Sequence, residues 1–342
     1  QGAGQKGARI QTLTALCAPW QSLCIAGNVK NAGKTTVLNA LIAAHPKARL
    51  GVSSIGLDGE ELDTVSRLPK PRVFLPAGSL LATAEDCLAQ SEARARVAAR
   101  TGIRTGLGEI LVASVTRPGN CLLGGPSTVE GMAAVRDSLL RLGADKVFID
   151  GAFARQSHAA AAQAMVYVVG AHASPFQSRV VESAGLALRR FALPGVPEAW
   201  QALPAQANPG WLDHQGRYTA LAGASALGKP AALLDAVPAG ACWLYLPGAL
   251  DTALADALVA RRNEQAFGLI VQSALSLVMS DAALGRLFRL GRGIRVLRPL
   301  TLAFVALNPY SPAGHRFDSA AFRQAMRGVT DLPLINVAED MN

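Results

Sequence analysis

A glycine-rich stretch decides the fold of this chain: Gly27-Asn28-Val29-Lys30-Asn31-Ala32-Gly33-Lys34-Thr35-Thr36. The apolar run 23–26 leads into it, and the helical pattern of residues 37–42 leads out. A strand, a glycine loop and a helix in this order form the setting of a phosphate-binding loop, whose backbone N–H groups converge on phosphate oxygens. We therefore predict that residues 27–36 bind the phosphates of a nucleotide.

The residues of this loop have separate expected roles. Gly33 lets the backbone approach the phosphates, Lys34 reaches the terminal phosphates, and the Thr35 hydroxyl binds Mg²⁺. The predicted nucleotide contacts are Gly27, Asn31, Gly33, Lys34, Thr35 and Thr36. The segment between Gly27 and Gly33 is one residue longer than in the usual loop, and the longer form resembles that of dethiobiotin synthetase. An ordinary strand-turn-helix with a surface lysine is the alternative.

Two carboxylates stand where a metal ion would need them. Asp58 follows one predicted strand, and Asp150 ends another. An acid at the carboxyl end of a strand beside a phosphate loop orients Mg²⁺ or the attacking water. We predict that Thr35, Asp58 and Asp150 hold Mg²⁺ and that Asp150 acts with Lys34 in catalysis. At both acids, a plain Asp-Gly turn is the alternative.

Two further segments carry possible ligand contacts. Glycines of the loop 124–128 precede a predicted helix, 129–142, so this loop offers either a second anion or substrate site or simple helix capping. Asn308 ends a predicted strand and is followed by proline. Its amide could read a nucleobase edge, or the segment could be a plain turn.

The composition limits the classes of partner. Half of the 342 residues are hydrophobic, 17% are charged, and the net charge is +9. This balance predicts a folded chain and suits anionic partners such as nucleotides. No concentrated basic tract with interleaved aromatic residues is present, so we do not expect a nucleic-acid partner.

Cysteine usage and hydropathy give the expected compartment. The five cysteines are widely spaced and form no Cys-x-x-Cys pair, which is typical of a reduced, cytoplasmic chain without a zinc site. No signal peptide is visible. The most apolar stretch, 159–173, is shorter than the about 20 residues that a membrane span needs, so we expect no membrane.

The alternation of apolar runs and helical patterns predicts an α/β fold. We expect a mostly parallel, P-loop NTPase-like sheet flanked by helices in residues 1–190, an irregular connector at 191–238, and a second α/β region at 239–342. Residues 79–99 read as one long helix. An oligomer is compatible with this organisation.

Seven short segments together suggest a family. They are Gly27–Thr36, Ser53–Glu60, Lys70–Arg72, Leu81–Glu85, Gly125–Ser127, Ile149–Ala152 and Asn308–Pro312. In this order they make the chain resemble the P-loop reactivase component associated with lysine 5,6-aminomutase and ornithine aminomutase. The resemblance covers most of the chain, best at residues 20–175, and does not extend to residues 191–238.

The resemblance implies a function in the repair of a cofactor. Such mutases use adenosylcobalamin and pyridoxal phosphate, their radical chemistry inactivates the cobalamin, and the reactivase uses ATP to exchange it. It implies an aminomutase and a second reactivase subunit as partners. It also implies a nucleotide at residues 33–36 and Mg²⁺ near Thr35, Asp58 and Asp150. The chain has no Asp-x-His-x-x-Gly segment, so it is not expected to bind cobalamin as the mutase does.

The leading hypothesis is thus a Mg²⁺-dependent protein that binds ATP, or GTP, and hydrolyses it to act on an aminomutase. A second hypothesis is an ATP-dependent ligase or kinase of cofactor biosynthesis resembling dethiobiotin synthetase. A third is a nucleotide-binding scaffold without hydrolysis.

Overall fold

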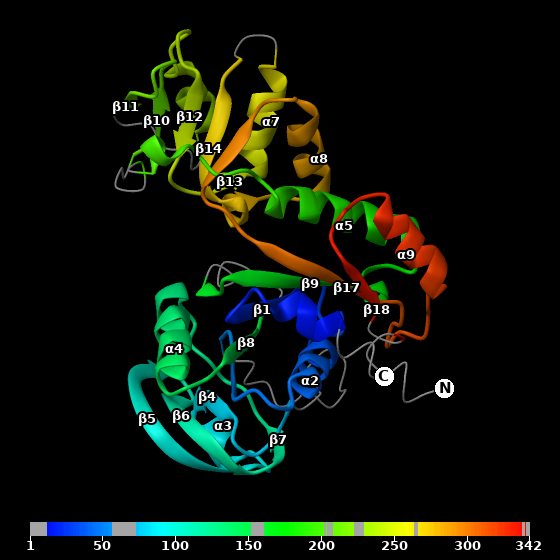
Figure 1. Ribbon diagram of the computed structural model, residues 1–342. Helices are drawn as coiled ribbons and strands as arrows, with labels where there is room; N and C mark the ends of the chain where they lie inside the picture. The colour runs from blue at the N-terminus through cyan, green and yellow to red at the C-terminus, as the bar shows by residue number, and fades with distance from the viewer. Residues whose placement is uncertain are drawn as a thin grey trace. The chain divides into compact units, whose positions relative to one another are not determined.

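The chain folds into two compact units in the computed structural model (Figure 1). The structure describes residues 12–56, 73–151, 161–201, 203, 208–221, 229–262, 266–336 and 339. The first unit contains residues 1–181 and 302–342, and the second contains residues 182–301. This division differs from the expected one, because the C-terminal stretch belongs to the first unit and not to the second α/β region.

A nine-stranded sheet forms the centre of the first unit, in the order β18-β17-β9-β1-β8-β2-β4-β6-β5. From β18 to β4 all neighbours are parallel, whereas β6 and β5 are antiparallel additions at one edge. The strands are β1 (Ser22–Gly27), β2 (Leu50–Ser54), β4 (Leu80–Ala84), β5 (Arg94–Thr105), β6 (Gly108–Arg117), β8 (Lys146–Asp150), β9 (Ala164–Gly170), β17 (Leu302–Asn308) and β18 (Leu334–Asn336). The α/β class and the mostly parallel sheet are confirmed.

Helices cover both faces of this sheet. Helix α2 (Lys34–Ala44) packs Val37, Leu38 and Leu41 into the core cluster that also holds Phe148 of β8. Helix α4 (Val129–Arg141) lies on the opposite face. A Cβ on Gly51 would contact its Leu139 at 3.1 Å, whereas the next residue of β2, Val52, points to the other side and into the cluster packed by α2. Figure 1 shows the two helices on either side of β8. Helix α9 (Ser319–Arg327) precedes β18.

The long helix expected at residues 79–99 is wrong. The structure has β4, the short helix α3 (Glu85–Ala89) and the start of β5 in its place. The alanine, leucine and arginine of this segment favour a helix intrinsically. Pairing of β4 between β2 and β6 overrides that preference, because it buries every residue of the strand. A second, small ladder joins β3 (Val73–Leu75) and β7 (Gly119–Cys121).

The second unit has a five-stranded sheet of its own, in the order β11-β10-β12-β14-β16. Strands β12 (Trp243–Leu246), β14 (Gly268–Ser273) and β16 (Ile294–Arg298) are parallel and alternate with helices α7 (Thr252–Ala260) and α8 (Asp281–Arg289). Strands β10 (Gly210–Leu212) and β11 (Tyr218–Ala220), together with helix α6 (Pro230–Asp235), arise from the segment expected to be an irregular connector. The unit begins within helix α5 (Gln177–Phe191).

Candidate functional site

The glycine-rich loop joins a buried strand to a helix, as the sequence predicts. Strand β1 ends at Gly27 and helix α2 begins at Lys34. Gly33 is the N-cap of α2 with φ 105°, and Asn31 also has a positive φ of 61°. No side chain caps this helix end. The first backbone N–H groups of a helix have no intrahelical acceptor, so this end of α2 offers them, with the positive end of the helix dipole, to an anion.

Lys34 folds back over the end of β1. A Cβ on Gly27 would lie 3.2 Å from Cγ of Lys34 and 3.1 Å from Cβ of Ala32. A side chain at position 27 would therefore be in tight contact with the lysine stem that crosses the loop. Thr35 and Thr36 occupy the first turn of α2. The predicted phosphate contacts Gly27, Gly33 and Lys34 are thus brought together.

Asp150 lies on the strand next to this loop. It ends β8 and is the register partner of Ile25 in β1 and of Ser54 in β2. Its carbonyl accepts a hydrogen bond from the backbone N–H of Ile55 at 2.8 Å. The next residue, Gly151, donates its N–H to the carbonyl of Ile25 at 2.8 Å, where a Cβ would clash. Asp58, the other predicted metal ligand, lies outside the described residues.

The charges of Lys34 and Asp150 both affect the pKa of a buried thiol, Cys24. The pKa of Cys24 in β1 is raised to about 12. Burial is the main cause, the charge of Asp150 adds to the increase, and the charge of Lys34 opposes it. Both side chains therefore act on one point near the end of β1. An ammonium and a carboxylate around one loop form the charge pattern that a metal–nucleotide ligand requires.

Asn308, which is distant in sequence, contacts the glycine-rich loop. Its Nδ2 donates to the carbonyl of Ala32 at 3.0 Å, and its Oδ1 accepts from the N–H of Tyr310 at 3.2 Å. A Cβ on Gly33 would lie 2.8 Å from the same Nδ2. Asn308 is thus at the predicted site and braces the loop backbone. Its contact with a nucleobase stays a prediction.

Three polar contacts that the sequence did not reveal hold the neighbouring strand ends. Asn28 accepts from the N–H of Gly170 through Oδ1 at 2.9 Å, which ties the loop to the end of β9. His172 contacts Ser311 through Nδ1 at 3.0 Å, and His315 contacts the carbonyl of Ala171 through Nε2 at 2.8 Å. In the sequence, Asn28 and His172 are polar residues just beyond an apolar run, and no such signal marks His315.

The loop 124–128 packs against the end of β2. The carbonyl of Pro126 accepts from the N–H of Gly56 at 2.8 Å, and a Cβ on Gly125 would overlap the carbonyl of Ser54. Thr128 caps α4 by accepting from the N–H of Gly131 at 3.0 Å, so the loop does cap the helix. The Ser54 hydroxyl is buried and has no hydrogen-bond partner within the described residues. Among the described residues, a buried hydroxyl without a hydrogen-bond partner is therefore present beside Asp150.

The residues present fit a magnesium–nucleotide ligand. Gly33 and Gly27 leave a cradle that side chains would fill, and the start of α2 is uncapped. Among the described residues, no group of three or more His, Cys, Asp or Glu side chains could hold a metal by itself. Mg²⁺ bound through nucleotide phosphates needs only one or two protein carboxylates besides a hydroxyl, a requirement that Asp150 and Thr35 suit.

The chain has no significant match among protein-family models, curated proteins or solved structures.

In the part of the chain that the structure describes, every helix is too short or too polar to cross a membrane.

Proposed function

We propose that this protein binds Mg²⁺–ATP, or Mg²⁺–GTP, at residues 27–36 and hydrolyses it. One observation carries the proposal: Lys34 lies across Gly27 beside the uncapped start of α2, and Asp150 ends the adjacent parallel strand. This combination of cation, helix end and carboxylate has little use in a plain strand-turn-helix. It is well suited to a polyphosphate with its metal ion.

Each residue has a defined task in this proposal. Lys34 neutralises charge on the terminal phosphates, and the N–H groups at the start of α2 hold the other phosphate oxygens. Thr35 and Asp150 hold Mg²⁺, with Asp58 as a further ligand, and Asp150 orients the attacking water. Mg²⁺, when bound, supplies the charge that offsets the phosphate oxygens. Hydrolysis needs little beyond this positioning and charge neutralisation.

The nucleotide would serve a partner enzyme. On the resemblance of the ordered sequence segments, we assign the chain to the reactivation of an adenosylcobalamin-dependent aminomutase, together with a second reactivase subunit. The damaged cobalamin would be exchanged in a step driven by ATP. The hydrogen bonds of Asn308 and Asn28 fix the loop backbone, which suits a site that is already ordered before its nucleotide binds.

The loop 124–128 favours a second candidate, an ATP-dependent ligase or kinase. This loop lies on the end of β2, whose Ser54 is the register partner of Asp150. A small carboxylate substrate bound there would sit near the strand end that carries the acid. Such an enzyme would turn over ATP without a protein partner, but only with its small substrate.

Turnover measurements separate these functions. We expect Mg²⁺–ATP hydrolysis that rises when a purified adenosylcobalamin-dependent aminomutase is added and is lost in Lys34→Ala. Lys47→Ala is the matched control, because Lys47 is exposed just beyond the other end of α2. Hydrolysis that needs only a small carboxylate would favour the ligase. Nucleotide binding without turnover, even with the mutase present, would indicate a scaffold.

A further inference from the structure

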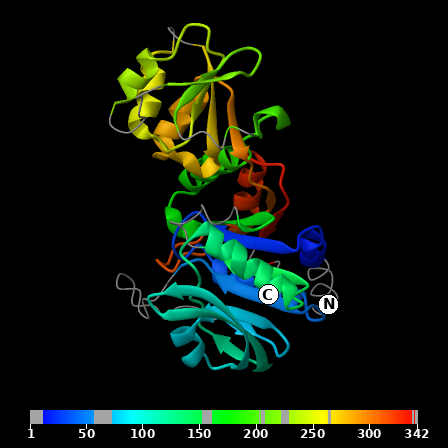
Figure 2. The ribbon, with the colours of Figure 1, turned by 90° about the vertical axis from the view of Figure 1, so that its left-hand side faces the viewer.

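The outermost strand of the large sheet has an unpaired edge. Strand β5 spans 12 residues at the end of the sheet and pairs with β6 alone among the described strands. Figures 1 and 2 show the curved pair at the border of the first unit. An end strand of this kind presents a row of backbone N–H and C=O groups to which another extended chain can add.

Arginines gather on this strand. Arg94, Arg96, Arg100 and Arg104 are all exposed along β5, and Arg94 stands directly opposite Arg117 of β6. Like charges placed opposite each other across two strands destabilise the pair. Within the described residues, no ion pair compensates Arg94, Arg96 or Arg117. This end of the strand therefore carries positive charge that an anionic partner would stabilise.

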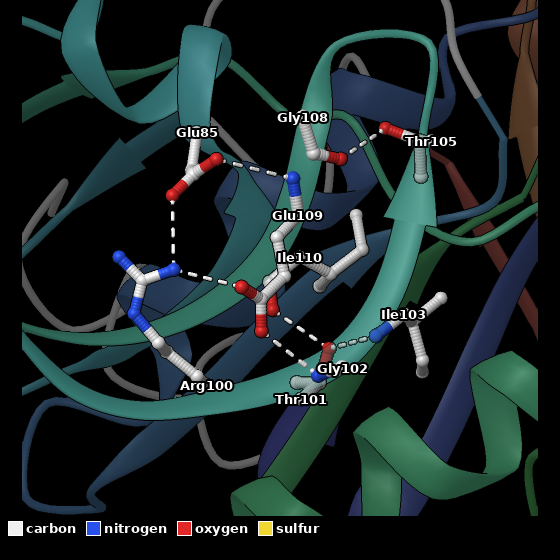
Figure 3. Close-up of polar contacts among 9 residues, drawn as sticks. All are labelled: Glu85, Arg100, Thr101, Gly102, Ile103, Thr105, Gly108, Glu109 and Ile110. Carbon is white, nitrogen blue, oxygen red and sulfur yellow. Dashed lines mark hydrogen bonds and ion pairs between the residues drawn. The ribbon is translucent and has the colours of Figure 1, made fainter.

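The opposite end of β5 is fixed by a polar network (Figure 3). Arg100 forms ion pairs with Glu85 at 3.2 Å and with Glu109 at 2.7 Å. Glu109 also accepts from the N–H of Gly102 at 2.9 Å, and the Thr101 hydroxyl donates to the carbonyl of Ile110 at 2.7 Å. These bonds hold residues 100–102 of β5 in place against β6 and α3 before any partner binds, at a point where the register between β5 and β6 shifts. Binding to it would therefore require little ordering of this chain.

We propose that β5 binds an extended, acidic segment of a partner protein by strand addition. Backbone pairing supplies the affinity, and Arg94 and Arg96, two residues apart on one stretch of β5, select carboxylates two residues apart in the partner. A second copy of this chain is disfavoured, because β5 paired with β5 would oppose arginine to arginine. The inference does not depend on nucleotide binding.

The test uses the full chain and a labelled peptide of alternating glutamate and threonine as long as β5. We expect saturable binding, weakened at least about tenfold in Arg94→Ser/Arg96→Ser. Lys47→Ser/Arg327→Ser removes two exposed cations elsewhere and should bind as wild type. Ala98→Pro should also weaken binding, because proline removes a backbone N–H from the strand. It should spare the ladder between β5 and β6, because Ala98 has no register partner on β6. Thermal unfolding checks that each variant is folded.

A change in the peptide keeps the test independent of variant folding. A peptide of the same charge, with proline in place of threonine, lacks every second backbone N–H donor and favours the polyproline II conformation over a strand. It should therefore bind at least about tenfold more weakly. Equal binding of the two peptides would overturn strand addition, as would equal binding by wild type and the Arg94→Ser/Arg96→Ser variant. Preference for single-stranded oligothymidylate over the peptide would overturn the protein partner.

Discussion

At the residue scale, two glycines shape the loop, and at Gly33 a side chain would be both strained and in collision with a neighbour. Gly33 has φ 105°, which L side chains rarely adopt, and a Cβ there would lie 2.8 Å from Nδ2 of Asn308. Gly27 leaves room for the stem of Lys34. The absence of side chains on its glycines thus shapes the loop. Among the described residues, Asn31 is its one non-glycine residue with a positive φ.

Gly33→Ala should lower both stability and nucleotide affinity. Strain at positive φ and the clash with Asn308 together should reduce the free energy of unfolding by about 2 kcal/mol. Urea unfolding measures this loss. Gly78→Ala is the control, because Gly78 has φ 89° but no atom within 4 Å of a Cβ, so it carries the strain without the clash. In the Asn308→Ala background, Gly33→Ala should reduce the free energy of unfolding by less. An unchanged reduction would exclude the proposed clash between a side chain at position 33 and Asn308.

The loop and Asp150 could be predicted because their signals are local. An apolar run, spaced glycines and a helical pattern lie within 20 residues of one another, and an acid closes a short apolar run. The bond from Asn308 to Ala32 spans 276 residues, and no local pattern encodes it. The sequence marked Asn308 as a candidate, but the order of strands in the sheet determines that it contacts Ala32.

At the element scale, α2 joins the site to a buried histidine at its far end. His45 is the C-cap of α2; its ring contacts Phe148, and its Nδ1 lies 2.8 Å from the carbonyl of Leu41. Burial lowers the pKa of His45 below its usual 6.5, the hydrogen bond with Leu41 opposes this, and the charge of Lys146 adds to it. The folded chain therefore favours the neutral ring.

This histidine should make stability depend on pH. The unfolded chain takes up the proton first as the pH falls below about 6.5, so the free energy of unfolding should decrease from there until the lowered pKa is passed. Urea unfolding between pH 7.5 and 5 measures the slope. His45→Gln should flatten it, whereas His214→Gln, which removes an exposed histidine, should not. An identical slope in wild type and His45→Gln would contradict the assignment.

Elements were predictable where the local pattern and the sheet agree. Helix α4 lies within a few residues of its expected position, and strands β8 and β17 end at Asp150 and Asn308 as expected. Residues 79–99 were misread, because their helix-favouring composition gives no sign that β4 is buried between two strands. The strands with which β4 pairs determine the structure of this segment, and a single sequence does not show which strands pair.

At the scale of the whole molecule, the chain leaves the first unit and returns to it. Strands β17 and β18 complete the large sheet beside β9, and Asn308 at the end of β17 braces the loop. The sequence predicted a second α/β region but not this return, because strand order is a property of the assembled sheet. The second unit, 182–301, has separate core clusters.

Nucleotide should stabilise the first unit selectively. Trp20 lies in the first unit, whereas Trp200, Trp211 and Trp243 lie in the second. In Trp20→Phe, tryptophan fluorescence reports the second unit alone. Mg²⁺–ATP at about 100 times its dissociation constant should stabilise the first unit by about 2.7 kcal/mol, seen by circular dichroism, without shifting this fluorescence transition. A shared shift of both signals would show that the two units unfold together.

The central claim is that residues 27–36 bind a nucleotide, and equilibrium binding of Mg²⁺–ATP and Mg²⁺–GTP tests it most directly. We predict saturable binding by wild type and by Lys47→Ala, and a loss of about tenfold to a hundredfold in Lys34→Ala, as expected for one charge-assisted contact. Absence of binding to both nucleotides, or equal affinity of wild type and a folded Lys34→Ala, would contradict the account.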